Sequence, residues 1–215
     1  MVTAFEPFGG ESVNPSEAAI AGLHRETFPG AELRTLTLPT SFGHSLEKLR
    51  RALEDWPADI VLAVGQAGGR SGLSVERVAI NLDDARIPDN SGQQPVDVPV
   101  VAGAPAAYFS TLPVKAMVAA IREAGVEASV SHSAGTFVCN HVFFGLRHMA
   151  ETTWPSMRCG FVHIPFLPEQ AAVRRISGSE PPSLDTASVT RGLAAAIAAI
   201  TRGGPEPHIT EGALS

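Results

Sequence analysis

The feature that most constrains the fold is a continuous apolar run at residues 60–64, Ile-Val-Leu-Ala-Val. A strand without polar alternation is typical of a parallel sheet whose two faces are both covered. Further strand-like runs alternate along the chain with segments whose apolar residues recur at helical spacing. The strand-like runs are residues 1–5, 32–38, 73–80, 126–131 and 160–164, and the helical segments are residues 14–24, 42–56, 113–124, 137–151 and 184–201. This alternation predicts an α/β fold, a three-layer α/β/α sandwich around a mostly parallel twisted sheet.

The organisation of the chain is expected to be a single domain. Its 215 residues suit one α/β domain with a full core. We place this domain at residues 1–202 and treat residues 203–215, which are rich in Gly and Pro at their start, as a C-terminal tail. The polar, proline-containing stretch 81–100 is longer than most loops in compact domains, which indicates a functional excursion.

Composition argues against two classes of partner. The formal net charge is −6 and no acidic or basic block stands out, so nucleic acid and an anionic membrane surface are not expected partners. The longest apolar helical stretch, residues 193–200, is too short to span a bilayer, and the apolar run 1–5 is too short for a signal peptide. Two cysteines provide no disulfide framework, which favours a reducing cytoplasm.

A candidate nucleophile lies in residues 133–146, where a strand-like run turns into a helix. Ala134 and Gly135 allow a sharp turn and a close approach of a ligand. The helix is expected to begin near Phe137 or Val138, which places Cys139 in its first turn. Free N–H groups and the positive end of the helix dipole would stabilise a thiolate there. A buried cysteine acting as a small hydrophobic residue is the alternative.

A cysteine nucleophile needs a base, and His163 is the best candidate. It ends the strand-like run Gly-Phe-Val-His and precedes Ile-Pro. His132 is the second candidate, although it lies just before the nucleophile turn. His141 and His148 lie seven residues apart on one helix, but no third ligand has convincing spacing for a metal site.

The acid that would orient this base is less defined by the sequence. Glu76 interrupts an apolar strand-like run, so its carboxylate must point at a partner or at water. Aspartates in the following loop are alternatives, although turn formation is their more common role: Asp83, Asp84, Asp89 and Asp97. Arg86 in the same loop could stabilise an oxyanion or form a salt bridge with one of these aspartates.

Four loops follow predicted strands, those after Phe5, Val64, Ser131 and His163. In an open parallel sheet such loops meet at the carboxyl edge, where active sites form. Phe5, Phe8 and Phe137 in these loops could contact a flat ring. The loop starting at Gly65 lacks the lysine and the spacing of nucleotide-binding loops, so we discount nucleotide binding.

Four motifs, in chain order, strongly resemble the pyroglutamyl peptidase I family, the pyrrolidone-carboxylate peptidases of the cysteine peptidase class. The resemblance covers roughly residues 1–200. The motifs are residues 5–10 with Asn14-Pro-Ser16, residues 65–90, residues 133–140, and residues 160–165 with Pro168-Glu-Gln170.

Carried over position by position, this resemblance implies a catalytic triad. Cys139 matches the nucleophile, His163 the general base and Glu76 the orienting acid, with Arg86 near the active site. The matched substrate-binding positions include aromatic residues that sandwich a lactam ring and residues whose backbone binds its amide: Phe5, Phe8, Asn14, Thr40, Gln66, Phe137 and Val138.

The resemblance also implies the activity, removal of N-terminal pyroglutamate from peptides through an acyl-enzyme. It implies an α/β/α sandwich assembled into homodimers or homotetramers, with no metal and no cofactor. Two other functions stay open at this point: a nucleoside-phosphorylase-like enzyme, and a binding module that keeps the pyroglutamyl pocket without turnover.

Overall fold

The computed structural model describes residues 1–212. The main sheet has six strands in the order β2-β1-β3-β8-β4-β7, and a separate hairpin pairs β5 with β6. The strands are β1 (Val2–Phe5), β2 (Thr35–Leu38), β3 (Ile60–Gln66), β4 (Leu73–Glu76), β5 (Val78–Ile80), β6 (Ala107–Phe109), β7 (Ala128–Ser131) and β8 (Arg158–Ile164). The α-helices are α1 (Pro15–Gly22), α2 (His44–Asp55), α3 (Val114–Glu123), α4 (Val138–Thr152), α5 (Pro168–Ala172) and α6 (Thr186–Arg202), and a 3₁₀ turn, η1 (Leu23–Arg25), follows α1.

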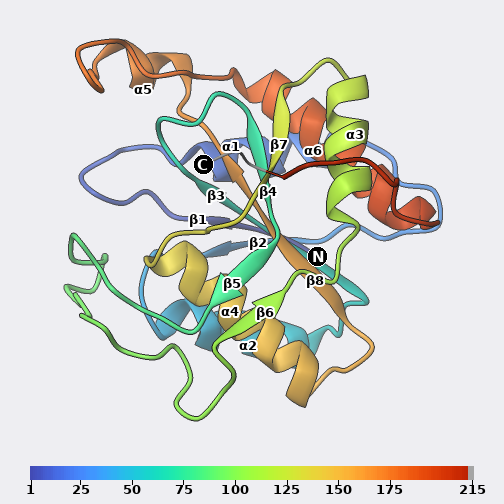
Figure 1. Cartoon of the computed structure of the whole chain (residues 1–215), viewed down its shortest axis with the longest axis horizontal. Coiled ribbons are helices and arrows are strands. Elements are labelled where there is room, and N and C mark those ends of the chain that lie inside the picture. The colour runs from blue at the N-terminus through green and yellow to red at the C-terminus, as the bar shows by residue number, and fades with distance from the viewer. Residues whose placement is uncertain (213–215) are drawn as a thin grey trace.

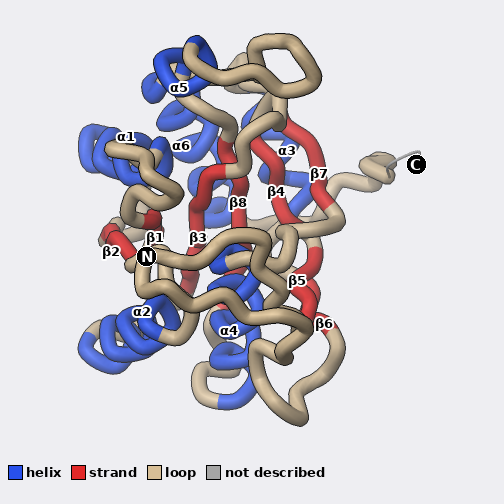
Figure 2. Tube along the Cα trace, turned by 90° about the vertical axis from the view of Figure 1, so that its left-hand side faces the viewer, coloured by secondary structure: helices blue, strands red, loops and turns tan. Residues whose placement is uncertain are grey.

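The sheet lies between two layers of helices, which confirms the predicted α/β/α sandwich. Figure 1 shows α1, α3 and α6 on one side of the sheet and α2 and α4 on the other, and Figure 2 shows the same layers from the side. The buried strands divide their side chains between these layers by pleat alternation. In β3, Leu62 and Val64 pack in the core beneath α3 and α6, whereas Val61 and Ala63 pack beneath α2 and α4.

Helix boundaries follow local signals in the sequence. The Asn14 side chain accepts a hydrogen bond from Ser16 N at the start of α1, and Pro15 occupies the first helical position. The Asp185 side chain caps α6 in the same way by accepting from Ser188 N. The helix α5 was not predicted because five residues are too few to show a period. After α6, residues 203–212 form no helix or strand.

The predicted strand 73–80 is wrong in one respect, because it forms two strands in different sheets. β4 lies in the main sheet, and the chain then bends at Arg77 so that β5 pairs with β6. At the bend, Arg77 N donates to Ser131 O and Arg77 O accepts from Ser110 N. An apolar run continues through such a bend unchanged, so the pattern alone could not reveal it.

Strand direction also corrects the expectation that four loops leave from one edge. β1, β2, β3 and β8 are parallel, but β4 is antiparallel to β8, and β7 is parallel to β4. The loop after β7 therefore leaves the sheet in the opposite direction. It still reaches the site because β4 ends at Glu76 beside Phe161, the middle residue of β8, and β7 ends at Ser131 level with Glu76. From there residues 132–137 can turn onto the face of the sheet that α4 covers.

Within residues 1–212, no helix combines the length and the hydropathy needed to cross a bilayer.

Candidate active site

A pocket of about 320 Å³ lies at the carboxyl ends of β1, β3 and β8, on the face of the sheet that α2 and α4 cover. Five segments far apart in the sequence supply its walls, around residues 5–14, 40, 66–70, 134–139 and 163. Its lining residues are Phe5, Phe8, Asn14, Thr40, Gln66, Ala67, Gly68, Arg70, Ala134, Gly135, Phe137, Cys139 and His163.

Cys139 occupies the first turn of α4, as the sequence predicts. Gly135 turns the preceding loop with a φ of 76°, a conformation that favours glycine. Phe137 is the N-cap, with extended backbone and no side-chain hydrogen bond, so the first N–H groups of the helix are left for a ligand. The residue as a whole is partly exposed, but its sulfur is buried against the backbone of β3. A Cβ atom added at Gly65 would stand 2.9 Å from the Cys139 Sγ.

The electrostatics of the thiol correct the expectation of a resting thiolate. Burial raises the pKa of Cys139 to about 12, with the Glu76 carboxylate adding to the increase and Arg70 opposing it. Removing the sulfur from water disfavours its charged form, and here this cost outweighs the favourable helix terminus. At neutral pH the Cys139 thiol therefore keeps its proton, and a reaction at its sulfur needs a base.

His163 and Glu76 form a buried pair. The two residues lie diagonally across the antiparallel strands β8 and β4 and share one face of the sheet. His163 Nδ1 and Glu76 Oε1 are 2.7 Å apart, and the residues are 3% and 0% exposed. A carboxylate at Nδ1 fixes the proton on that nitrogen and leaves Nε2 as the basic atom.

Burial sets the charge state of His163, whereas neighbouring groups set that of Glu76. Burial lowers the pKa of His163, although the hydrogen bond and charge of Glu76 act in the opposite direction. Burial alone would raise the pKa of Glu76, but the hydrogen bond and charge of His163, together with the charge of Arg70, hold it below its ordinary value. The resting pair is thus a neutral imidazole oriented by an ionised carboxylate.

The cation at the pocket is Arg70, which sequence reasoning did not select. Its Nη1 donates to Glu76 Oε1 at 2.6 Å, and its Nη2 donates to Ser133 O at 3.0 Å. Arg86, the predicted cation, is exposed and lies outside the pocket lining. The available signal for Arg70 was its place in the loop after β3, where residues at the carboxyl edge gather.

Most residues matched to substrate binding do line the pocket, on the walls around the thiol. The Phe8 and Phe137 rings face each other at a centroid distance of 6.0 Å. Asn14 Nδ2 and Thr40 Oγ1 both donate to Glu6 O, at 3.1 and 2.8 Å, and thereby hold the turn after β1. Val138 is fully buried and is not among the lining residues.

The other histidines considered as a base or as metal ligands lie outside the pocket lining. His132 is exposed and does not line the pocket. His141 Nδ1 bonds Asp83 Oδ2 at 2.7 Å, and His141 Nε2 accepts from Gly43 N at 3.1 Å. His148 Nδ1 bonds Tyr108 Oη at 3.0 Å. Across residues 1–212, no three His, Cys, Asp or Glu side chains group in a way that could hold a metal ion.

The alternative acids are used elsewhere too. Asp89 accepts from three backbone N–H groups, those of Phe42, Ser91 and Gln93, which anchors the 81–100 loop beside the pocket wall. These backbone bonds outweigh burial and lower the pKa of Asp89. Only Glu76, among the candidate acids, bonds His163.

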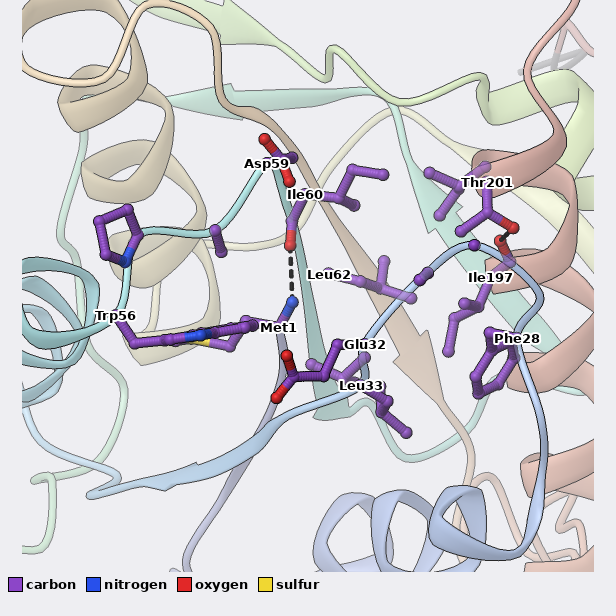
Figure 3. Close-up of a pocket in the computed structure, with 16 residues that line it drawn as sticks. Met1, Phe28, Glu32, Leu33, Trp56, Asp59, Ile60, Leu62, Ile197 and Thr201 are labelled. Carbon is purple, nitrogen blue, oxygen red and sulfur yellow. Dashed lines mark hydrogen bonds between the residues drawn. The ribbon is translucent and has the colours of Figure 1, made fainter.

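A second cavity of about 330 Å³ lies at the opposite ends of β1 and β3 (Figure 3). Apolar side chains such as Phe28, Trp56 and Ile197 form much of its wall, and the Met1 amino group donates to Ile60 O at 2.7 Å. None of the residues that line it is a cysteine, histidine or serine, whereas the pocket at the other end of these strands is lined by Cys139 and His163.

Known proteins resemble this chain along nearly its whole length. Residues 1–203 match the family model of pyroglutamyl peptidase. The chain is 53% identical over 215 residues to the pyrrolidone-carboxylate peptidase of Streptomyces coelicolor, with 99% of this chain and 97% of that protein covered. It is 55% identical over 197 residues to that of Erwinia tasmaniensis, with 92% and 90% covered.

Solved structures show the same fold. Pyroglutamyl peptidase I from Bacillus amyloliquefaciens superposes with a TM-score of 0.88 at 44% identity, covering 94% of this chain and 96% of that chain. The pyrrolidone carboxyl peptidase from Thermococcus litoralis gives a TM-score of 0.88 at 36% identity, covering 93% and 91%.

Proposed function

Since this chain belongs to the pyroglutamyl peptidase family of cysteine-type hydrolases, we propose that it removes the N-terminal pyroglutamyl residue from peptides. The observation that carries the proposal is the buried His163–Glu76 bond of 2.7 Å in a pocket that Cys139 also lines. A nucleophile, a base and an orienting acid are the parts that acyl transfer requires.

In the proposed first step, Cys139 Sγ attacks the pyroglutamyl carbonyl carbon while His163 Nε2 takes the thiol proton. The neutral thiol and neutral imidazole suit this order, because the base is free when the attack begins. Glu76 stabilises the imidazolium that forms and keeps its orientation. Imidazolium then donates its proton to the leaving amine as the C–N bond breaks.

The second step releases the product. His163 Nε2 takes a proton from water as the water oxygen attacks the thioester carbon. The C–S bond then breaks, the imidazolium returns its proton to Cys139 Sγ, and pyroglutamic acid leaves. In both steps negative charge develops on the carbonyl oxygen. In this proposal the N–H of Cys139 at the start of α4 stabilises it, an interaction worth about 3 kcal/mol per donor.

Specificity is proposed to come from a slot for a neutral ring. Phe5, Phe8 and Phe137 supply apolar surface, and Gln66 at the end of β3 also lines the pocket, where its backbone would bind the lactam amide. The lactam nitrogen carries no charge, so it can be buried with hydrogen bonds alone. An N-terminal glutamine or glutamate would carry an ammonium group into this slot, at a cost of several kcal/mol.

The test is hydrolysis of a pyroglutamyl chromogenic amide with and without iodoacetamide. We expect turnover in the untreated protein, loss of turnover after alkylation, and no turnover in the Cys139→Ala variant. The matched control is Cys159→Ala, because Cys159 is fully buried in β8 and does not line the pocket. Hydrolysis that survives in Cys139→Ala would contradict the assignment of the nucleophile.

Two further parts of the proposal concern the state of the protein. Both cysteines are unpaired, which supports a reducing cytoplasm as its compartment. Assembly into homodimers or homotetramers is proposed from the family resemblance, and size-exclusion chromatography with light scattering tests it.

A further inference from the structure

Arg70 makes contacts that the proposed triad does not account for. It lies in the loop between β3 and β4, and its guanidinium joins two parts of the site. Nη1 reaches Glu76 Oε1 at 2.6 Å, and Nη2 reaches the Ser133 carbonyl at 3.0 Å. One side chain thus connects the orienting acid to the loop that precedes the nucleophile helix.

The bond to Glu76 uses an oxygen that is already occupied. Glu76 Oε1 accepts from both His163 Nδ1 and Arg70 Nη1, while Glu76 Oε2 is buried without a hydrogen-bond partner. The carboxylate is 0% exposed, so water cannot replace either donor. A buried anion held by one neutral imidazole would be poorly compensated, because buried charges need a partner of opposite sign.

The bond to Ser133 acts on the nucleophile. Residues 132–137 connect β7 to α4, and the part of this loop that includes Gly135 turns with a φ of 76°. Other bonds hold this loop as well: Ser131 Oγ at the end of β7 donates to Ser133 O, Ser133 Oγ accepts from Gly135 N, and Thr136 exchanges two hydrogen bonds with the backbone of Asp84. None of these bonds reaches Glu76, so Arg70 supplies the link between the loop and that carboxylate.

We propose that Arg70 is a positioning residue for the reaction, a two-pronged clamp that holds the Glu76 carboxylate against His163 and holds the Ser133 loop that carries Cys139. The proposal rests on the proposed function. A planar guanidinium can donate to two acceptors at fixed angles, which a lysine ammonium on a flexible stem does less well.

The clamp has an electrostatic consequence that can be measured. The positive charge of Arg70 acts to lower the pKa of His163 and also that of Cys139. The groups that face His163 are Glu76 from β4, Cys139 from α4 and Arg70 from the β3–β4 loop, while β3 presents only Gly65 in register with it. Loss of Arg70 leaves Glu76 as the only permanent charge among them, so both pKa values rise.

The experiment compares Arg70→Gln and Arg70→Lys with the full-length wild type. For Arg70→Gln we expect kcat/KM for a pyroglutamyl amide to fall about 100-fold, mainly through kcat, because small misplacements of reacting groups cost this much. The acid limb of the pH profile should move to higher pH, since His163 then holds its proton more tightly. Arg70→Lys keeps the charge, so it should restore the acid limb while recovering only part of kcat.

A matched control separates the clamp from a general loss of an arginine. Arg50 pairs with Glu54 on the exposed surface of α2 and lies outside the pocket. Arg50→Gln should leave kcat/KM, KM and the pH profile unchanged. An effect of Arg50→Gln equal to that of Arg70→Gln would overturn the proposal.

Chemical rescue tests the clamp in a variant with space for a ligand. Arg70 is partly exposed at the pocket, so guanidinium chloride at millimolar concentration should raise the kcat of Arg70→Ala in a saturable way. Equal concentrations of sodium chloride and urea serve as controls. An unmoved acid limb in Arg70→Gln, together with no guanidinium rescue, would refute the proposed role.

The alkylation rate of Cys139 tests the effect of Arg70 on the thiol without requiring hydrolysis of a substrate. The rate of Cys139 alkylation by iodoacetamide is measured as a function of pH. The rise of this rate with pH should shift to higher pH in Arg70→Gln than in the wild type. If the wild type alkylates at Cys139 but does not hydrolyse the amide, the proposed function fails, and the alkylation profiles still decide the role of Arg70.

Discussion

Replacing Gly65 with alanine tests how closely the reacting sulfur is held against the sheet. A Cβ atom at this position would lie 2.9 Å from Cys139 Sγ and 2.8 Å from Phe161 Cζ. Carbon and sulfur atoms pack at about 3.5–4 Å, so the sulfur or the ring must move by about 1 Å. The backbone of Gly65 lies in β3 without a positive φ, so the effect is steric only.

The displacement gives two expected magnitudes. A shift of about 1 Å in a reacting group costs about 100-fold in rate, so kcat should fall by that factor. Overpacking of a core costs about 1–3 kcal/mol, which for a chain of this size lowers Tm by about 2–12 °C. We therefore expect a folded Gly65→Ala protein with a modest loss of stability and a large loss of kcat.

The assay measures kcat and KM on a pyroglutamyl chromogenic amide, with Tm from differential scanning fluorimetry. The matched control is Gly192→Ala in α6, where the added Cβ would lie 2.9 Å from Leu73 Cδ2 on the opposite face of the sheet. It should lose a similar amount of stability and keep kcat. A Gly65→Ala enzyme with kcat within threefold of the wild type would refute this account of the site.

Three further predictions concern the catalytic pair and the ring slot. Glu76→Gln replaces a charged acceptor by a neutral one, so kcat should fall about 100-fold with little change in KM. This factor is the kinetic equivalent of one charge-assisted hydrogen bond, and an equal change in kcat and KM would argue against an orienting role. Because burial lowers the pKa of His163, kcat/KM in the wild type should stay high as the pH falls and reach half its maximum below pH 6.5; a midpoint above that value would show a raised pKa. Phe137→Ala should raise KM about 10-fold or more through lost ring contact, and competition by free pyroglutamate measures the same loss; an unchanged KM would place the lactam elsewhere.

Local patterns were sufficient for much of the fold. The apolar run at 60–64 forms the first five residues of β3. At the start of α1, Asn14 is the N-cap and Pro15 is the first helical residue, as the sequence predicts. Such signals are local because they depend on pleat alternation, helical period and hydrogen bonds between near neighbours. Strand direction is not local, since an alternating or apolar strand reads the same in either direction. The reversal of β4 and β7 therefore could not be predicted.

For the candidate site too, the sequence indicated which residues matter, and only the structure showed how they are arranged. Cys139, His163 and Glu76 were chosen from the residue types that acyl transfer needs and from the motifs around them. The structure brings His163 and Glu76 into contact and places Cys139 in the same pocket. For the cation, the few basic residues of the 81–100 loop and the family resemblance both selected Arg86, whereas the packing of the β3–β4 loop places Arg70 beside Glu76.

The sequence by itself determined which reactive side chains this protein carries and which segments form strands and helices, because both depend on the side chains and their near neighbours. The tertiary structure alone decided that burial raises the pKa of the Cys139 thiol and that Arg70 joins Glu76 to the Ser133 loop. These two properties depend on how much water reaches a group and on which charges lie beside it, and both arise only when distant segments pack together.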